Sequence, residues 1–118
     1  MEYRNKQGQL HRVKGPAITY ASGTREWYLN GLLHRDGGPA VELSTGTRIW
    51  YQHGRIHRED NPAYVQTDGS QYWYKNGIVH RDNGPAITWA DGTHSWWFNG
   101  QEVSHLEHWL LAGAKEIA

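Results

Sequence analysis

The feature that most constrains the fold of this chain is a period of 23 residues. A His-Arg pair occurs four times at this spacing, beginning with His11-Arg12, and a Pro-Ala pair follows each one. Two series of glycines and one series of tryptophans keep the same phase, and no insertion or deletion disturbs it between residues 8 and 100. The unit reads G-T-x-x-W-Y-x-N-G-x-x-H-R-x-x-G-P-A, and five series in one phase predict an array of structural repeats.

Each unit carries two turn signals, which predict a strand on either side. Asn30-Gly31 has the sequence of a two-residue hairpin turn, in which both positions take a positive φ. Asp91-Gly92 belongs to the second series and predicts a turn of the same kind. The segments between the turns alternate and are rich in aromatic and β-branched residues, as strands are. Each repeat is therefore expected to supply two strands of an antiparallel meander.

The turns also predict the register of the strands. A two-residue turn at Asn30-Gly31 sets Trp27 opposite His34, and the same turn at 91–92 sets Ile87 opposite Trp96. One face of the sheet is then expected to carry the Trp and His rows, and the other face the Tyr, Ala and Arg rows. A further series is assigned to the Trp face: Ile18, Val41, Tyr64 and Ile87.

A jog rich in Asp and Gly separates His-Arg from Pro-Ala in every unit, for example at residues 36–39. Proline cannot donate to a strand ladder, so pairing must break or shift there. One hairpin is expected to use the strand before the jog, and the next hairpin the strand after it. The prediction is a bent, staggered sheet over residues 3–103 that grows by one hairpin per repeat.

The repeat pattern stops near residue 100, and the next segment predicts a short helix over residues 104–113. Ser104 and Glu107 form a capping box, and Gly113 supplies a stop signal. One face of this helix is apolar, and it is expected to fold over the last strand and cap the open sheet edge. The alternative is that this face docks on a partner or on a second copy. Its residues are Leu106, Trp109 and Leu110.

Composition agrees with one small all-β domain over residues 1–118, an antiparallel hairpin array in a single curved sheet with a C-terminal capping helix. The chain has seven Trp and seven Tyr but only 37% hydrophobic residues, and its mean hydropathy is −0.83. Its large core side chains are therefore mostly aromatic, which argues against a long helical bundle. No apolar run approaches the roughly 20 residues of a membrane span.

Charge is balanced overall but unevenly distributed along the chain. Residues 1–35 carry six basic and two acidic side chains, which gives +4, and residues 36–81 carry five of each. Residues 82–118 carry one basic and five acidic side chains, which gives −4. An elongated chain would then have oppositely charged ends, which favours head-to-tail association or a partner with split charge. The alternative is chance drift among surface residues.

Two absences bear on the compartment. The chain has no Cys, which excludes a disulfide framework and a thiolate metal site. The first ten residues, MEYRNKQGQL, contain no apolar stretch of the signal-peptide type. Both features are expected of a cytoplasmic protein.

Eight histidines raise the question of metal binding or catalysis. One repeat advances the sheet by two strands, or about 9–10 Å, so neighbours in the repeated His row lie too far apart to share a metal. Each is expected instead to bond backbone near the jog. His105 and His108 have chelating spacing, but the sequence fixes no third ligand. With no nucleophile motif, phosphate loop or carboxylate pair either, we expect no enzyme activity, no cofactor and no metal.

The repeated Arg and Trp rows are also predicted to be structural. Arg35 is expected opposite Glu26, which indicates ion pairing, and Arg81 opposite Tyr72, which indicates cation–π stacking. The alternative for the Arg row is phosphate binding. The Trp row buries area in a thin sheet, and its alternative is a stacking platform for sugars or nucleobases.

The stretches WYLNGLLH at residues 27–34 and TWADG at 88–92 resemble the MORN repeat, whose units are also 23-residue hairpins. The resemblance covers residues 3–103. The chain departs from the family by an extra residue between Trp and the turn, by Arg after His, and by Gly-Pro-Ala in place of Gly-x-Gly. It is similar to divergent repeats of small bacterial and phage proteins. The resemblance implies a curved, non-catalytic scaffold that binds protein or, less often, lipid.

Residues that break the phase of the repeat serve something local, so we take them as candidates for binding. They gather toward the C-terminal half, where Trp and Tyr mix with Arg in the composition of interface hot spots. The expected surface is the Trp face. The candidate binding residues are Trp89, Trp96, Trp97, Phe98, Tyr72, His94, Arg48, Arg55 and His53.

The function predicted from the sequence is a non-catalytic protein-binding module, such as a phage-type inhibitor or adaptor that occludes a host or bacterial protein. The alternative is a binder of carbohydrate or single-stranded nucleic acid that uses a Trp/Tyr stacking platform. Such a chain could also form homo-oligomers, either by pairing of sheet edges or through its oppositely charged ends.

Overall fold

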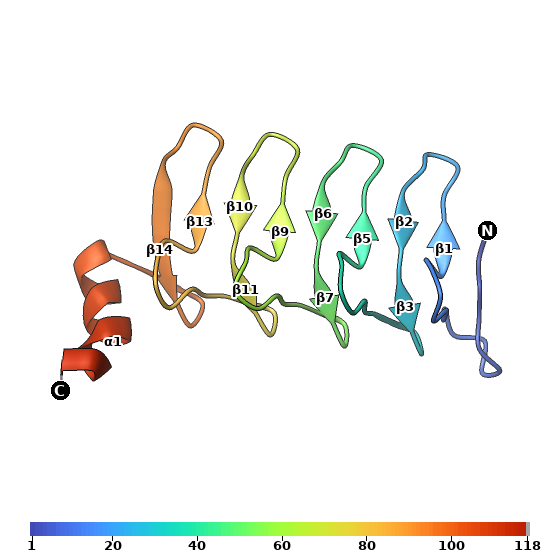
Figure 1. The fold of residues 1–118 in the computed structure, drawn as a ribbon, viewed down its shortest axis with the longest axis horizontal. Helices are drawn as coiled ribbons and strands as arrows, with labels where there is room; N and C mark the ends of the chain where they lie inside the picture. The colour runs from blue at the N-terminus through green and yellow to red at the C-terminus, as the bar shows by residue number, and fades with distance from the viewer. Residues whose placement is uncertain (118) are drawn as a thin grey trace.

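The computed structural model describes residues 1–117, which form an elongated strip measuring 52 × 31 × 20 Å with a helix at one end (Figure 1). The described part contains one nine-stranded sheet, in the order β1-β2-β5-β6-β9-β10-β13-β14-β15, and three separate two-stranded hairpins. The strands are β1 Ile18–Thr19, β2 Arg25–Glu26, β3 Tyr28–Leu29, β4 Leu32–Leu33, β5 Val41–Glu42, β6 Arg48–Ile49, β7 Tyr51–Gln52, β8 Arg55–Ile56, β9 Tyr64–Val65, β10 Gln71–Tyr72, β11 Tyr74–Lys75, β12 Ile78–Val79, β13 Ile87–Thr88, β14 His94–Phe98 and β15 Gln101–Val103.

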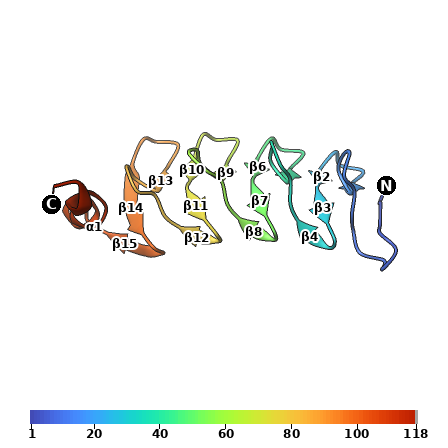
Figure 2. The same cartoon turned by 60° about the horizontal axis from the view of Figure 1, so that its bottom comes forward.

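The staggered pairing expected from the jog is confirmed. β4, before the jog, pairs only with β3, whereas β5, after the jog, pairs with both β2 and β6. Figure 2 shows the result as two rows, with β4, β8, β12 and β15 along one edge of the strip. Each repeat thus adds two short strands to the main sheet and one small hairpin beside it.

A single layer of this kind has a small core. No large side chain of the described residues is fully buried, and the residues with no exposed surface are the alanines after each proline. These alanines are Ala17, Ala40, Ala63 and Ala86. Because the layer is one sheet thick, most side chains are shared between a neighbouring repeat and solvent.

The Asn-Gly turns have the predicted geometry. Asn30 and Gly31 both take positive φ, 48° and 82°, and Tyr28 lies opposite Leu33. His53 replaces the turn Asn in the third repeat and adopts the same conformation, with φ of 50°. A turn with two positive φ values matches the twist of the flanking strands. Few residue types adopt a positive φ, so few are accepted at these two positions.

The Asp-Gly turns differ from the prediction by one residue. Trp89 N–H donates to Thr93 O and Gly92 N–H donates to Trp89 O, both at 2.9 Å, which closes a three-residue loop. The positive φ is at Gly92 and not at Asp91. Ile87 therefore lies opposite Ser95, and its predicted pairing with Trp96 was wrong. A three-residue hairpin loop is a type I turn followed by one left-handed residue that forms a bulge, so it needs a positive φ only at the Gly.

This slip of one residue also corrects the assignment of faces, because neighbouring residues point to opposite sides of a sheet. The series from Ile18 to Ile87 shares a face with the tyrosines, and the alanines share a face with the tryptophans. We call the first the tyrosine face: Ile18, Tyr20, Glu26, Tyr28, Val41, Ile49, Tyr51, Tyr64, Tyr72, Tyr74, Ile87, Trp89, Ser95 and Trp97. We call the second the tryptophan face: Trp27, Trp50, Trp73, Trp96, the four alanines, Arg25, Arg48, Gln71 and His94.

The C-terminal helix α1 covers His105–Ile117 and packs against β14. The predicted capping box is present: Ser104 N–H donates to Glu107 Oε1 at 3.1 Å, and Glu107 N–H donates to Ser104 Oγ at 3.0 Å. The predicted end at Gly113 was wrong, because the helix continues through it. An internal glycine costs a helix only about 1 kcal/mol, so it need not be a stop.

The helix caps the sheet with the opposite face from the one predicted. His105 stacks on Trp96 with ring centroids 3.9 Å apart and planes at 9°, and the buried His108 bonds the carbonyl oxygen of Arg81 through Nε2. The apolar face points outward instead, with Leu106 66% and Leu110 50% exposed. Periodicity identifies an apolar face but does not say which face meets the sheet.

Candidate protein-binding surface

The repeated histidines connect each repeat to the next. His34 Nδ1 accepts the backbone N–H of His53 at 3.0 Å, and His57 Nδ1 accepts that of Asn76 at 3.0 Å. This N–H belongs to the turn of the following repeat and not, as predicted, to the jog. With Nδ1 accepting, Nε2 carries the hydrogen, and in His57 it faces Glu59 Oε1 at 2.8 Å. Both nitrogens therefore have structural partners.

Among the side chains that the structure describes, those of residues 1–113, no three His, Asp or Glu come together at a point where an ion could bind. His105 and His108, which have chelating spacing, are placed against Trp96 and the Arg81 carbonyl as described above.

The repeated arginines lie over aromatic rings of the tryptophan face. The guanidinium carbons of Arg35, Arg58 and Arg81 are each 3.9 Å from the ring centroid of the Trp of their own repeat. Nη1 of each donates to the proline carbonyl of the jog at 3.0–3.1 Å. Such a contact combines cation–π attraction with packing.

The partners predicted for two of these arginines were wrong. Glu26, expected opposite Arg35, pairs with Ile18 and Val41, and Tyr72, expected opposite Arg81, pairs with Tyr64 and Ile87. The chain leaves the strand after each histidine, so the arginine swings over the Trp and does not continue the ladder. The ion-pair partner of Arg35 is Glu42, at 3.2 Å.

The Arg row covers the Trp row. Trp27 is only 7% exposed, and Trp27, Trp50 and Trp73 each have a guanidinium over the ring. In the last repeat, where Ser104 replaces the Arg, His105 takes its place over Trp96. One side of every ring in the row is thus already occupied, which argues against the Trp row as a stacking platform.

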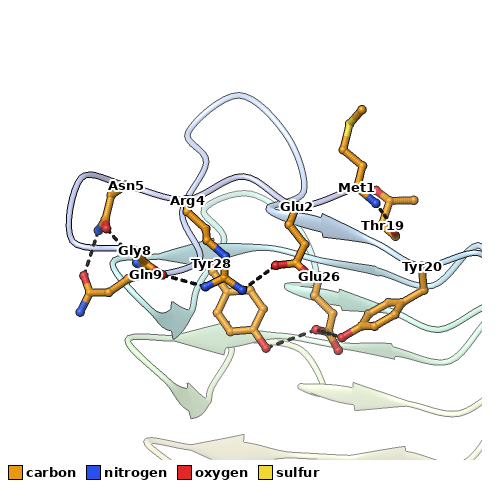
Figure 3. Close-up of polar contacts among 10 residues, drawn as sticks. All are labelled: Met1, Glu2, Arg4, Asn5, Gly8, Gln9, Thr19, Tyr20, Glu26 and Tyr28. Atoms are coloured by element: carbon orange, nitrogen blue, oxygen red, sulfur yellow. Dashed lines mark hydrogen bonds and ion pairs between the residues drawn. The ribbon is translucent and has the colours of Figure 1, made fainter.

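The tyrosine face has no such cover. At its N-terminal end, Tyr20 and Tyr28 direct their hydroxyls to the same carboxylate oxygen, Glu26 Oε1, at 3.0 and 3.2 Å (Figure 3). Further along, the rings of Tyr64 and Tyr72 meet edge to face with centroids 5.2 Å apart. The strand residues of this face from position 41 to 97 include no charged side chain.

Three tyrosines of this face have raised pKa values. The pKa of Tyr28 is raised to about 12, first by burial and then by the neighbouring Glu26 carboxylate. Burial also raises the pKa of Tyr51 and of Tyr74, and in both cases nearby tyrosines, Tyr64 among them, contribute. Hydroxyls of successive repeats therefore lie within electrostatic reach of one another.

The nine candidate residues do not form one surface. Three lie on the tyrosine face, three on the tryptophan face, and three near the row of small hairpins. The first group is Tyr72, Trp89 and Trp97; the second is Arg48, His94 and Trp96; the third is His53, Arg55 and Phe98. Trp89 is 39% exposed, whereas Trp97 is held by a hydrogen bond from Nε1 to Ser95 Oγ at 2.8 Å.

Sequence reasoning missed the rest of the tyrosine face because Tyr28, Tyr51 and Tyr74 are in phase and were read as architecture. A correct register would have revealed them, since it places the series containing Tyr64 on the same face. It also missed Tyr3, which takes the place of the Trp in the first repeat and carries Arg12 at 4.0 Å.

The N-terminal segment completes the array. Gly8 N–H donates to Asn5 O at 3.0 Å, so the first small hairpin has a longer turn than the others. Figure 3 shows Arg4 bonded to Glu2 and to the Gly8 carbonyl. These contacts place the first residues beside β1, where Glu2 bridges to Ile18.

Comparisons with known proteins found no match for this chain. No protein-family model matches the chain, and neither a curated protein nor a solved structure matches it. None of the helical segments within residues 1–117 has the length and apolarity needed to cross a membrane.

Proposed function

We propose that this protein is a non-catalytic protein-binding module and that the tyrosine face is its binding surface. The observation that supports this most directly is the contrast between the two faces: arginines lie over the rings of Trp27, Trp50 and Trp73, whereas the described structure places no arginine over a ring of the tyrosine face. Tyrosines bury a large area at a low cost in side-chain entropy and keep a hydroxyl for hydrogen bonding. They are therefore enriched where proteins bind one another.

The chemistry of the face favours a particular kind of partner. Between positions 41 and 97 its strand residues are aromatic, β-branched or hydroxyl-bearing and carry no charge. A partner surface of mixed apolar and hydrogen-bonding character, with few charges, would leave no charge buried without a counter-ion. A strip 52 Å long could cover such a surface and block it, as expected of an inhibitor or adaptor, including one of the phage type.

We further infer that the array is a divergent MORN-like repeat, for which a scaffolding role is expected. The alternative function, binding of carbohydrate or single-stranded nucleic acid, would have to use the tyrosine face together with Trp89 and Trp97. Titration with oligosaccharides and with single-stranded oligonucleotides, followed by Trp fluorescence, tests it. Saturable quenching would favour the alternative, and an unchanged spectrum would exclude it.

The test of the main proposal is affinity capture from native lysate followed by mass spectrometry. The binding variant is Tyr51→Thr with Tyr74→Thr, and the matched control is Arg48→Thr with Gln71→Thr on the tryptophan face. We expect one protein to be enriched by the wild type and by the control but not by the binding variant. Circular dichroism checks that both variants fold. Enrichment that the tyrosine substitutions leave unchanged, or no enrichment at all, would overturn the proposal.

A further inference from the structure

After Met1, the two most exposed large apolar side chains lie at opposite ends of the strip. Val13, in the first jog, is 77% exposed, and Leu106, in the first turn of α1, is 66% exposed. We propose that these ends meet: the apolar face of α1 in one copy docks in a groove of the first repeat in a second copy. This goes beyond the proposed function, because the tyrosine face plays no part in it.

The helix offers three apolar anchors on one face. Leu106, Trp109 and Leu110 are 66%, 49% and 50% exposed, and their spacing of i, i+3 and i+4 is the one by which helices dock in grooves. The opposite face holds the helix in place, since His105 stacks on Trp96 and His108 is buried. The anchors are thus presented on a fixed helix, so little order has to be gained on docking.

Acidic residues predominate at this end of the chain. Residues 82–118 contain five acids and one basic residue, Lys115; Glu107 lies in the helix, and Asp82 lines a groove together with Trp109. Pairing α1 with the α1 of a second copy would bring these like charges together. A basic acceptor is favoured instead, because complementary charges steer association and like charges oppose it.

The first repeat contains an acceptor with both properties. A groove of about 370 Å³ lies there, with Val13 and Leu29 as apolar lining and Arg12, Lys14 and Arg35 as basic lining, of which Arg35 also pairs with Glu42. Its volume is in the range of pockets that enclose several side-chain groups. The one acidic residue of the lining, Asp36, is 3.1 Å from His34 Nε2.

The repeat itself shows what distinguishes this groove. The equivalent groove two repeats later also has about 370 Å³, but it has Glu59 and Asp60 at the positions of Val13 and Lys14. The later groove also has Lys75 at the position of Leu29, so its three basic residues are balanced by three acids and both apolar residues are lost. The first groove, with three basic residues, one acid and two apolar residues, therefore favours an acidic helix with apolar anchors.

Because the groove and the helix are different surfaces, the contact is heterologous, and a pair of copies keeps one free groove and one free helix. The net charges of +4 over residues 1–35 and −4 over residues 82–118 have the sign that such head-to-tail contact needs. Chains can then add one after another, and the association weakens as salt screens the ends.

Two variants disable the two ends separately. Val13→Glu with Lys14→Asp converts the groove to the residues that the chain itself carries at 59–60, so the fold should tolerate them. Leu106→Gln with Leu110→Gln removes two exposed anchors and keeps good helix formers. The matched control is Glu59→Asp in the later groove, which keeps the charge of that groove and introduces the residue that the chain itself carries at the equivalent positions 36 and 82. Circular dichroism confirms folding of all three.

Sedimentation velocity over a concentration series gives the readout. We expect the wild type and the control to form dimers and larger species at low salt, with at least tenfold weaker association in 0.5 M NaCl. Each end variant alone should stay monomeric. A mixture of the two end variants should form a one-to-one dimer and nothing larger, because only one intact helix and one intact groove can meet.

Several results would overturn the proposal. A wild type that stays monomeric at every concentration excludes self-association, and a groove variant that still dimerises indicates helix-to-helix pairing. Co-sedimentation of the wild type, but not of the helix variant, with zwitterionic phosphatidylcholine vesicles would make a lipid surface the occupant. The substituted residues lie outside the tyrosine face. Failure of this proposal would therefore not affect the result of the capture experiment that tests the proposed function.

Discussion

At the scale of single residues, the repeated side chains hold the array together by reaching into the neighbouring repeat. His57 shows this most plainly, because its Nδ1 accepts a backbone N–H from the next turn while its Nε2 faces Glu59 in its own jog. A His at this position is recognisable from the sequence by its period. Its partner is not, because a bond to a residue 19 positions later depends on the stagger of the sheet.

Replacing His57 tests this role. His57→Leu removes the acceptor of the solvent-exposed Asn76 N–H, so we expect a loss of about 0.5–1.5 kcal/mol in the free energy of unfolding. His57→Asn offers an oxygen near the position of Nδ1 and should lose less. Urea denaturation of the three proteins measures the difference. Equal losses in both variants would show that the acceptor is not what matters.

The tyrosine hydroxyls make stability depend on alkaline pH. The pKa of Tyr28 is about 12 in the folded protein, above the 10.0 of an unperturbed tyrosine, so the folded state holds this proton more tightly. The resulting stability is fully present below pH 10 and is lost as the pH rises from 10 toward 12. Urea denaturation at pH 9 and pH 11 should therefore show a smaller decline for Tyr28→Phe than for the wild type.

At the scale of elements, the sequence predicted the repeat, the strands, the jog and the capping box, because each depends on local chemistry. It failed at the Asp-Gly turns. Asp91 and Gly92 are as favourable for a two-residue turn as Asn30 and Gly31, but only the Asn takes a positive φ. One residue of register then moved a whole series to the other face, and with it the surface expected to bind.

The helix shows the same limit. Its start was predictable from Ser104 and Glu107, which bond one another's backbone. Its orientation was not predictable. Apolar helix faces usually turn toward the sheet, but here the Trp96 ring has no arginine over it, and His105 stacks on it instead. The sequence signal for this was the missing Arg: Ser104 stands where the repeat would place it.

The cap of this helix can be tested directly. Ser104→Ala removes the acceptor for the Glu107 N–H and should cost about 1 kcal/mol of helix stability, whereas Ser104→Asp should keep it. Hydrogen exchange of the amides at 108–113 measures the effect. We expect protection to fall roughly fivefold in the Ala variant alone, since about 1.4 kcal/mol corresponds to a factor of ten. Equal protection in all three proteins would contradict this.

At the scale of the whole molecule, each repeat contacts only its neighbours, so the length of the array is open to change. Deleting residues 36–58 removes one period of 23 and joins Arg35 to Glu59 in phase. We expect this protein to fold with a lower melting temperature, because one set of interfaces is lost. Deleting residues 36–57 breaks the phase and should prevent folding. Thermal melts followed by circular dichroism compare the two deletion proteins. Equal melting behaviour would contradict the idea that each repeat is a separate structural unit.

The thinness of the sheet has a mechanical consequence. Its strands lie across the long axis, and no large described side chain is fully enclosed, so a pull on the two ends loads the strand pairs one after another (Figure 1). The array should behave as a zipper. Each 23-residue unit that opens would release at most about 80 Å of chain, and a force trace would record a series of small, equal steps.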